Sequence, residues 1–210
     1  LAGRYARTAL RTNNLASFHQ MVSGADSHAL DEMLGATLAS ADLEDLENAD
    51  LYLFLGGNPT TDNPVLGWRM KRRMRAGTEA IVINSAEIDL VPHATLWADP
   101  RRGTATKLLA GVIAELLRRG AVNEEFISRR TVNFDQVKSQ LEGEDLHEVA
   151  LVTGVSEAKI RAIVELLSDP SKKIVAWYNL DSRLDRASDD LKALATLMMM
   201  LGKVGGKGSG

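Results

Sequence analysis

The chain has 210 residues, of which 45% are hydrophobic and 25% charged, with a net charge of −3 and no cysteine. This composition is typical of one globular domain, or one and a half, and it excludes disulfides, thiolate-bound zinc and thiolate-bound iron–sulfur clusters within the sequence. The slight negative charge gives no support for a nucleic-acid partner. No apolar run approaches the roughly 20 residues that a membrane-spanning helix needs, so we expect no direct insertion into a membrane.

Hydrophobic periodicity, capping residues and glycine stops predict a series of helices along the chain. They are expected at Leu1–Arg11, Ser27–Leu34, Leu43–Asn48, Pro64–Gly77, Gly103–Arg119, Asn123–Arg130, Phe134–Leu141, Leu146–Thr153, Ser156–Leu167 and Ser188–Leu201. Short apolar runs predict strands at Asp50–Leu55, Glu79–Asn84, Ala94–Ala98 and Lys172–Tyr178.

The alternation of strands and helices predicts an α/β fold: a three-layer, Rossmann-like domain with a mostly parallel sheet. This domain is expected over residues 1–201, with a helical insertion at about 123–168. Residues 202–210 form a tail rich in glycine and lysine, which we interpret as a flexible linker or as a loop that leads to a missing domain. The first residue is not Met, so we expect a piece of a longer protein, and the lack of cysteine favours a reducing, cytoplasmic location.

The most informative motif is the loop Gly56-Gly57-Asn58-Pro59-Thr60-Thr61-Asp62-Asn63-Pro64, which follows the apolar run Leu51–Leu55. A glycine-rich turn between a strand and a helix allows backbone to approach a ligand closely, and the start of the next helix offers unpaired N–H groups to a phosphate. The loop lacks a Walker lysine and the G-x-G-x-x-G spacing. An ordinary turn, in which asparagine and proline serve turn geometry, is the alternative.

The helix that follows this loop is strongly basic. Lys71, Arg72, Arg73 and Arg75 form one face, which is typical of a solvated face or a subunit contact rather than an anion site.

A set of short motifs in a fixed order carries a family resemblance. They are T-N-N at 12–14, E-N-A-D at 47–50, G-G-N-P-T at 56–60, N-P-V at 63–65, H-A at 93–94, R-x-G-T at 101–104 and the final segment 189–210. Together they resemble the molybdopterin oxidoreductases, in particular formate dehydrogenase α subunits and the large iron–sulfur subunit of NADH:quinone oxidoreductase.

The resemblance implies a domain that holds the guanosine part of a molybdopterin guanine dinucleotide. Family positions for the cofactor map to Gly56, Gly57, Asn58, Pro59, Thr60, Asn84, Gly103 and Thr104. Asn84 stands where the family has an acid, Ala86 where it has an arginine and Ala105 where it has a second acid. Arg101 and Arg102 are candidate phosphate partners, although a basic pair in a loop is more often simply solvated.

The largest difference between this sequence and the family pattern concerns the residue that ligates the metal. By the spacing of the motifs, the Cys or selenocysteine position falls at or beside Val22, whose side chain has no lone pair for molybdenum or tungsten. Ser23 replaces the histidine that often follows, and His19 and His28 are isolated. We therefore predict no catalytic residue and no metal bound by this segment, with the dinucleotide either retained or lost.

Three functions compete on this basis. The first is a scaffold and interface domain of an NADH:quinone oxidoreductase-type large subunit, with electrons passing through iron–sulfur clusters outside this segment. The second is the dinucleotide-binding domain of a catalytic formate dehydrogenase-like subunit, and the third is an unrelated Rossmann-like module. Val22 and Asn84 favour the first over the second. The expected partners are the other domains of the same subunit and the other subunits of an oxidoreductase complex.

Overall fold

Four parallel strands form a single sheet in the computed structural model, which describes residues 2–14, 28–36, 39–179 and 187–210. The strands are β1 (Leu51–Leu55), β2 (Glu79–Ile83), β3 (Leu96–Ala98) and β4 (Ile174–Tyr178), in the spatial order β3-β2-β1-β4. The α/β class and the parallel sheet are therefore confirmed.

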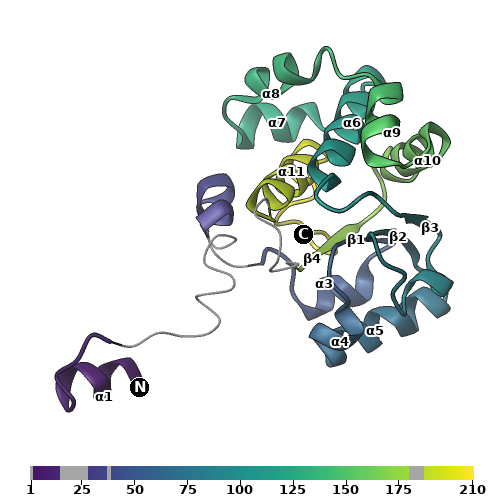
Figure 1. Cartoon of the computed structure of the whole chain (residues 1–210). Helices are drawn as coiled ribbons and strands as arrows, with labels where there is room; N and C mark the ends of the chain where they lie inside the picture. Colours follow the sequence, from purple (N-terminus) through teal and green to yellow (C-terminus); the bar gives the residue numbers. More distant parts are fainter. Residues whose placement is uncertain (1, 15–27, 37–38, 180–186) are drawn as a thin grey trace.

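The helices follow the predicted order with small changes at their ends (Figure 1). They are α1 (Ala2–Thr8), residues 28–34, α3 (Leu43–Asn48), α4 (Pro59–Asp62), α5 (Pro64–Arg75), η1 (Val91–His93), α6 (Ala105–Arg118), α7 (Glu124–Arg130), α8 (Phe134–Leu141), α9 (Leu146–Thr153), α10 (Glu157–Leu167) and α11 (Ala187–Met200). The short helix α4 was not predicted. Helix α6 begins two residues later than expected, because Gly103 has a φ of +77° and Thr104 is the N-cap.

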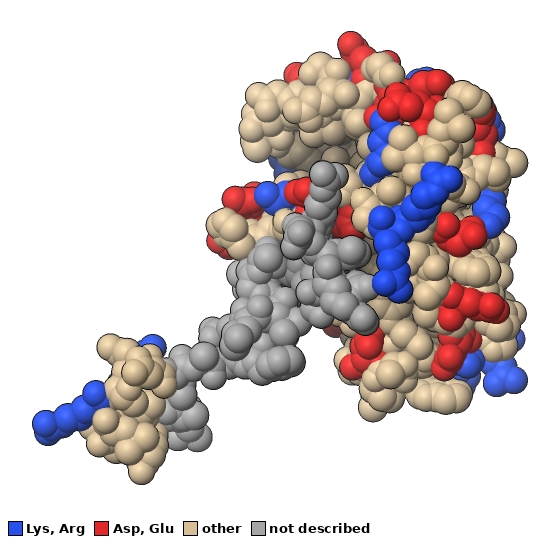
Figure 2. Space-filling view, viewed as in Figure 1, with Lys and Arg blue, Asp and Glu red and all other residues tan. Residues whose placement is uncertain are grey.

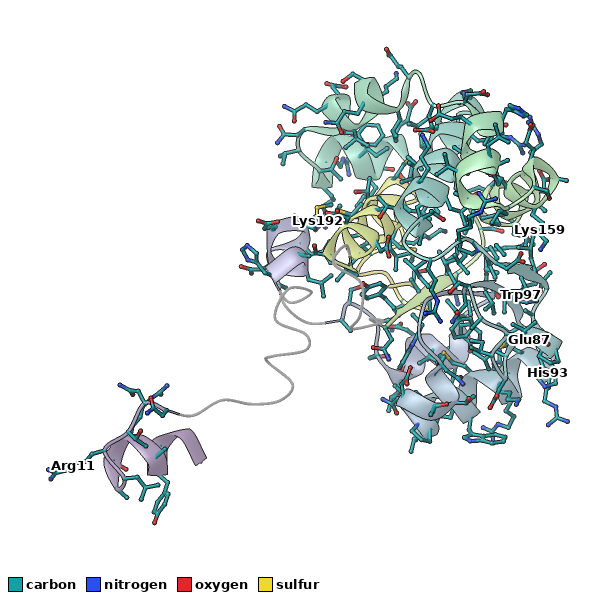
Figure 3. All side chains as sticks on the ribbon, viewed as in Figure 1. Arg11, Glu87, His93, Trp97, Lys159 and Lys192 are labelled. Atoms are coloured by element: carbon teal, nitrogen blue, oxygen red, sulfur yellow. The ribbon has the colours of Figure 1, made fainter. Side chains whose placement is uncertain are left out.

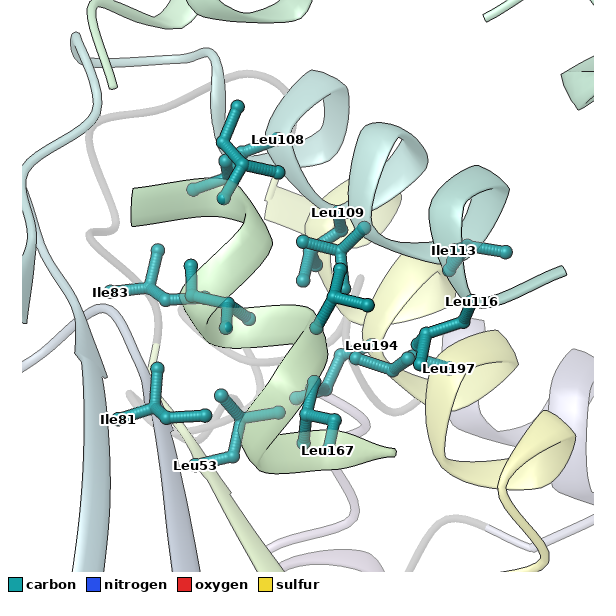
Figure 4. Packing of buried hydrophobic residues seen from close by; sticks show 14 of the residues in the cluster. Leu53, Ile81, Ile83, Leu108, Leu109, Ile113, Leu116, Leu167, Leu194 and Leu197 are labelled. Atoms are coloured by element: carbon teal, nitrogen blue, oxygen red, sulfur yellow. The ribbon is translucent and has the colours of Figure 1, made fainter. Parts of the chain in front are cut away.

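Side chains alternate between the two faces of the sheet and create two cores. On one face, Leu53, Ile81 and Ile83 pack against α6, α10 and α11 (Figure 4). On the other face, Tyr52 and Phe54 pack against residues of α3 and α5. All five residues of β1 are buried, as expected for a central parallel strand covered on both sides. The structure is thus three-layered, with the sheet between two helical layers (Figure 1).

Helices α8, α9 and α10 pack against α6 and lie between β3 and β4 in the chain, while α7 contacts α11. A buried carboxylate joins this group: Glu115 on α6 forms ion pairs with Arg118, Arg119 and Arg161. Although burial opposes ionisation of Glu115, the arginines outweigh it and lower the pKa of this carboxyl. The helical segment is therefore tied to α6 by charge as well as by apolar packing.

The glycine-rich tail lies along the free edge of β4. The Gly210 N–H donates to the carbonyl of Ile174 at 3.1 Å, and the Ala176 N–H donates to the carbonyl of Gly210 at 2.7 Å. Nearby, the Gly208 N–H donates to the carboxylate of Asp45 at the start of α3. Backbone pairing thus attaches the tail to the domain, in contrast to the behaviour of a flexible linker.

Candidate functional site

A cleft of about 350 Å³ opens at the carboxyl ends of the strands. The chain runs outward from β1 to β2 and β3 and then crosses back to β4 on the other side of β1. The strand order therefore reverses beside β1, and the strand ends form a crevice there. The lining includes the predicted residues Gly56, Gly57, Asn58, Asn84 and Gly103, together with Asp62, Ser85, Arg101, Arg102, Asn179 and Asp190. The predicted residues Pro59, Thr60 and Thr104 lie next to the cleft and do not line it.

The two glycines after β1 are required by the approach of another loop. Gly56 and Gly57 have φ angles of +69° and +57°. A Cβ atom on Gly56 would lie 2.8 Å from the carbonyl oxygen of Asn179, and one on Gly57 would lie 2.6 Å from the Asn179 Cβ. The glycines therefore allow the β1 loop to contact Asn179, and all three residues line the cleft.

Asp62 fixes the β1 loop in this position. Its Oδ2 accepts hydrogen bonds from the Asn58 N–H and from the Asn179 side-chain amide, each at 2.7 Å. Thr60 is buried beneath the loop, and its hydroxyl lies 2.8 Å from Asn58 Oδ1 and 3.0 Å from Asp89 Oδ2. These polar groups of the loop thus serve mainly to hold the loop itself.

Asn84, at the end of β2, forms hydrogen bonds to neighbouring residues through both its side-chain amide and its backbone carbonyl. Its Nδ2 donates to the Gly57 carbonyl at 2.7 Å, and its Oδ1 accepts from the Ala86 N–H at 3.0 Å. Its backbone carbonyl also accepts from Trp97 Nε1 at 3.0 Å. An aspartate could not donate to the Gly57 carbonyl, so asparagine is the residue that joins the ends of β1 and β2 here.

The two arginines before α6 differ in their contacts: Arg101 is hydrogen-bonded within the domain, whereas Arg102 is free to contact a ligand. The Arg101 guanidinium donates to the carbonyls of Leu151 and Val152 at the end of α9, which is a favourable place for a cation. Arg102 is exposed, lines the cleft and has no ion-pair partner among the described residues. Basic side chains are visible in the middle of the face shown in Figure 2, near the start of α6. Arg102 is therefore the basic group that the described part of the cleft offers to an anion.

The cleft also contains a buried acid that was not predicted from the sequence. Asp190, in the first turn of α11, is 9% exposed, and its Oδ1 accepts a hydrogen bond from the Thr106 hydroxyl at 2.5 Å. Burial raises the pKa of Asp190, while hydrogen bonds from the side chain and backbone of Thr106 partly oppose the shift. Asp190 thus places a carboxylate at the start of α6, beside Ala105, where the resemblance implied that an acid had been lost.

Replacing Asp190 by asparagine should make the protein more resistant to urea at pH 7. The raised pKa means that ionisation of Asp190 opposes folding, and this cost is present above the folded-state pKa and disappears as the pH falls below the ordinary value. Asparagine keeps an oxygen for Thr106 and carries no charge. Urea denaturation of both proteins from pH 3 to pH 7 should give a stability difference that shrinks toward zero in acid. An unchanged or reversed difference would contradict the assignment.

Other charged groups near the strand ends have structural partners. Asp99, just after β3, accepts from Lys159 Nζ at 2.8 Å, and this pairing lowers the pKa of the Asp99 carboxyl. The same ammonium lies 5.9 Å from the centre of the Trp97 ring, and Figure 3 shows these two residues on one side of the molecule. Lys192 of α11 pairs with Glu32 at 2.6 Å. These charged groups pair with one another at the surface of the domain and do not line the cleft.

No three His, Asp or Glu side chains within the described parts of the chain come together in a way that could hold a metal ion. His28 is exposed and lies 3.3 Å from Glu32. Val22, Ser23 and His19, on which the sequence prediction about the metal ligand depends, lie outside the described residues. The absence of a protein metal ligand therefore stays a prediction. No helix of the described residues has the length and hydropathy to cross a membrane.

Comparisons with known proteins agree with the family resemblance. The family model for molybdopterin oxidoreductase matches residues 5–210. Similar proteins include F420-dependent formate dehydrogenase 1 subunit alpha of Methanococcus maripaludis, which is 24% identical over 99% of the chain and 31% of its own length. Formate dehydrogenase H of Escherichia coli is 22% identical over 96% of the chain and 28% of its own length. NADPH-Fe(3+) oxidoreductase subunit alpha of Geobacter sulfurreducens is 26% identical over 97% of the chain and 24% of its own length.

A solved structure also shares the fold. Acetylene hydratase from Pelobacter acetylenicus superposes with a TM-score of 0.74 over 87% of this chain and 25% of its own, at 19% sequence identity. The chain thus spans about a third or less of each of these proteins.

Proposed function

Because this chain belongs to the molybdopterin oxidoreductase family, we propose that it is a scaffold and interface domain of an oxidoreductase subunit that has lost its molybdenum ligand. The NADH:quinone oxidoreductase large subunit is the type of protein that we propose. Its partners would be the other domains of the same subunit and further subunits of a cytoplasmic complex. Several similar proteins are themselves described as alpha subunits of larger enzymes.

The observation that supports this proposal is the use of the cleft's polar groups within the domain. In a nucleotide site, the ends of β1 and β2, the arginines before α6 and the start of α6 would hold phosphate, ribose and base. Here the Asn84 amide bonds to Gly57, the Arg101 guanidinium bonds to the end of α9, and Asp190 occupies the start of α6. A carboxylate at this helix end repels a phosphate. These residues do not fit a tightly held guanine dinucleotide.

The second candidate is the dinucleotide-binding domain of a catalytic, formate dehydrogenase-like subunit. Arg102 favours it, because this arginine lines the cleft and has no ion-pair partner among the described residues. The similarity to formate dehydrogenases over almost the whole chain supports the same candidate. When bound, the pterin cofactor would carry the metal and its redox chemistry, whereas this domain would only hold and orient the nucleotide part.

Guanine nucleotide binding separates the two candidates. We expect isothermal titration calorimetry of this chain with GDP to give a dissociation constant in the millimolar range or no saturable heat. The reason is that one arginine must attract the phosphates against the Asp190 carboxylate. ADP serves as the control for general nucleotide attraction. Micromolar or tighter binding of GDP, with weaker binding of ADP and loss of affinity in Arg102→Ala, would instead support the catalytic candidate.

A further inference from the structure

Helix α5 packs one face against the core and exposes a second face to solvent, and the exposed face carries apolar and basic side chains. Its inward residues Met70 and Met74 are buried beneath the sheet. On the outward side, Val65 is 68% exposed and Trp68 is 57% exposed. The exposed side chains that continue this stripe toward the end of the helix are Arg69, Arg72 and Arg75. Their spacing of three or four residues places them on one side of the helix, so apolar and basic groups form a continuous surface.

The charge of this helix contrasts with that of the chain. The twelve residues of α5 contain four arginines, one lysine and no acid, whereas the whole chain has a net charge of −3. Arg69 pairs with Glu47 at 3.2 Å, and Lys71 Nζ lies 5.2 Å from the centre of the Trp68 ring. Arg72 and Arg75 have no ion-pair partner in the part of the chain that the structure describes.

These side chains border a groove of about 460 Å³ between α3 and α5. It is lined by Glu47, Trp68, Arg69, Lys71, Arg72 and Arg75. None of these residues takes part in the two cores or in the cleft at the strand ends. The fold therefore does not explain why a tryptophan and several arginines gather here.

We propose that this surface, which we call the α5 face, binds an acidic protein segment of a partner subunit in which an apolar or aromatic side chain lies between carboxylates; this inference rests on the interface role proposed above. The apolar side chain would pack on Val65 and Trp68, and the carboxylates would pair with Arg72 and Arg75. Tryptophan and arginine are the residues that most often dominate binding energy at protein interfaces. The guanidinium group also matches a carboxylate with two parallel hydrogen bonds.

A protein segment explains the surface better than a polyanion does. Nucleic acid attracts a track of cations with no need for exposed apolar residues, so a nucleic-acid partner would leave Val65 and Trp68 unexplained. A helix that lies in a membrane interface buries its apolar face in lipid, whereas the apolar residues Met70 and Met74 of α5 are already buried in the core. Val65 and Trp68, in contrast, would gain free energy when an apolar side chain covers them.

Selection from a random peptide library displayed on phage tests the proposal, with the immobilised chain as the target. Clones that also bind Arg72→Glu/Arg75→Glu are removed. The matched control is Arg129→Glu/Arg130→Glu, which reverses two arginines in the last turn of α7. We expect enriched peptides with Asp or Glu around Phe, Leu or Trp. Their affinity should fall by about tenfold or more in Trp68→Ala, a variant that plays no part in the selection, and should stay unchanged in the control. It should also fall as salt rises.

Several outcomes would overturn the proposal. They include a library that yields no enriched peptide, and enriched peptides that lack acids or bind equally to the Trp68→Ala variant. Tighter binding of a short DNA duplex or of phosphatidylglycerol vesicles through the same residues would assign the surface to a polyanion or a membrane. Self-association in analytical ultracentrifugation that Trp68→Ala abolishes would assign it to a second copy of the chain. Because the α5 face lies apart from the cleft, none of these results depends on nucleotide binding.

Discussion

Replacing Gly67 by alanine is expected to lower the free energy of unfolding by about 2–3 kcal/mol, the cost of overpacking a close contact. Gly67 is buried in α5, and an added Cβ atom would lie 2.4 Å from the carbonyl carbon and oxygen of Pro59 and 2.5 Å from the nitrogen of Thr60. These are backbone atoms, so no side-chain rotation can relieve the overlap. The β1 loop would have to move away from α5.

Urea denaturation followed by circular dichroism measures this effect. Gly143→Ala is the matched control, because an added Cβ atom at Gly143 would meet nothing within 4 Å and its φ is not positive. Its free energy of unfolding should change by less than about 0.5 kcal/mol, as is usual for an open surface site. If Gly67→Ala were as stable as this control, the loop would not depend on close packing against α5.

Local signals in the sequence were sufficient for most of the secondary structure. Helices Leu43–Asn48, Phe134–Leu141 and Leu146–Thr153 have the predicted bounds. At two of them an aspartate caps the start: Asp42 accepts from two backbone N–H groups, and Asp145 accepts from the His147 N–H. The strands were predictable because β1, β2 and the start of β4 are buried and almost continuously apolar. The one-turn helix α4 was missed because Pro59 and the flanking Asn58 and Asn63 resemble the residues of a turn.

The candidate site was predictable only in part. Its location follows from the end of β1, because ligands of open α/β sheets bind where strands end and the connections diverge. The roles of individual side chains depend on contacts between distant parts of the chain. Thr106 and Asp190 are 84 residues apart, and Asp62 and Asn179 are 117 residues apart. No local pattern encodes such pairs, so Asp190 was not predicted, and the engagement of Arg101 with α9 was not predicted either.

The metal content of the complete subunit is the second large effect that we expect. A subunit that contains this chain should bind no molybdenum or tungsten in stoichiometric amount and should not oxidise formate with an artificial electron acceptor. The proposed reason is that the ligand position falls at or beside Val22, which cannot ligate a metal, and that Asn84 and Arg101 in the cleft bond within the domain. Inductively coupled plasma mass spectrometry and a formate-dependent dye-reduction assay measure both quantities.

The complete subunit is the decisive sample, because removing this domain from its neighbours would itself release a cofactor that several domains hold. We expect iron in either case, since the proposed clusters outside this segment would supply it. Iron without molybdenum or tungsten therefore supports the scaffold proposal. Stoichiometric molybdenum or tungsten with turnover of formate would refute it. A Val22→Cys variant adds a sharper comparison: it introduces a thiolate where the resemblance places the ligand, and metal retained only by this variant would support loss of that side chain as the cause.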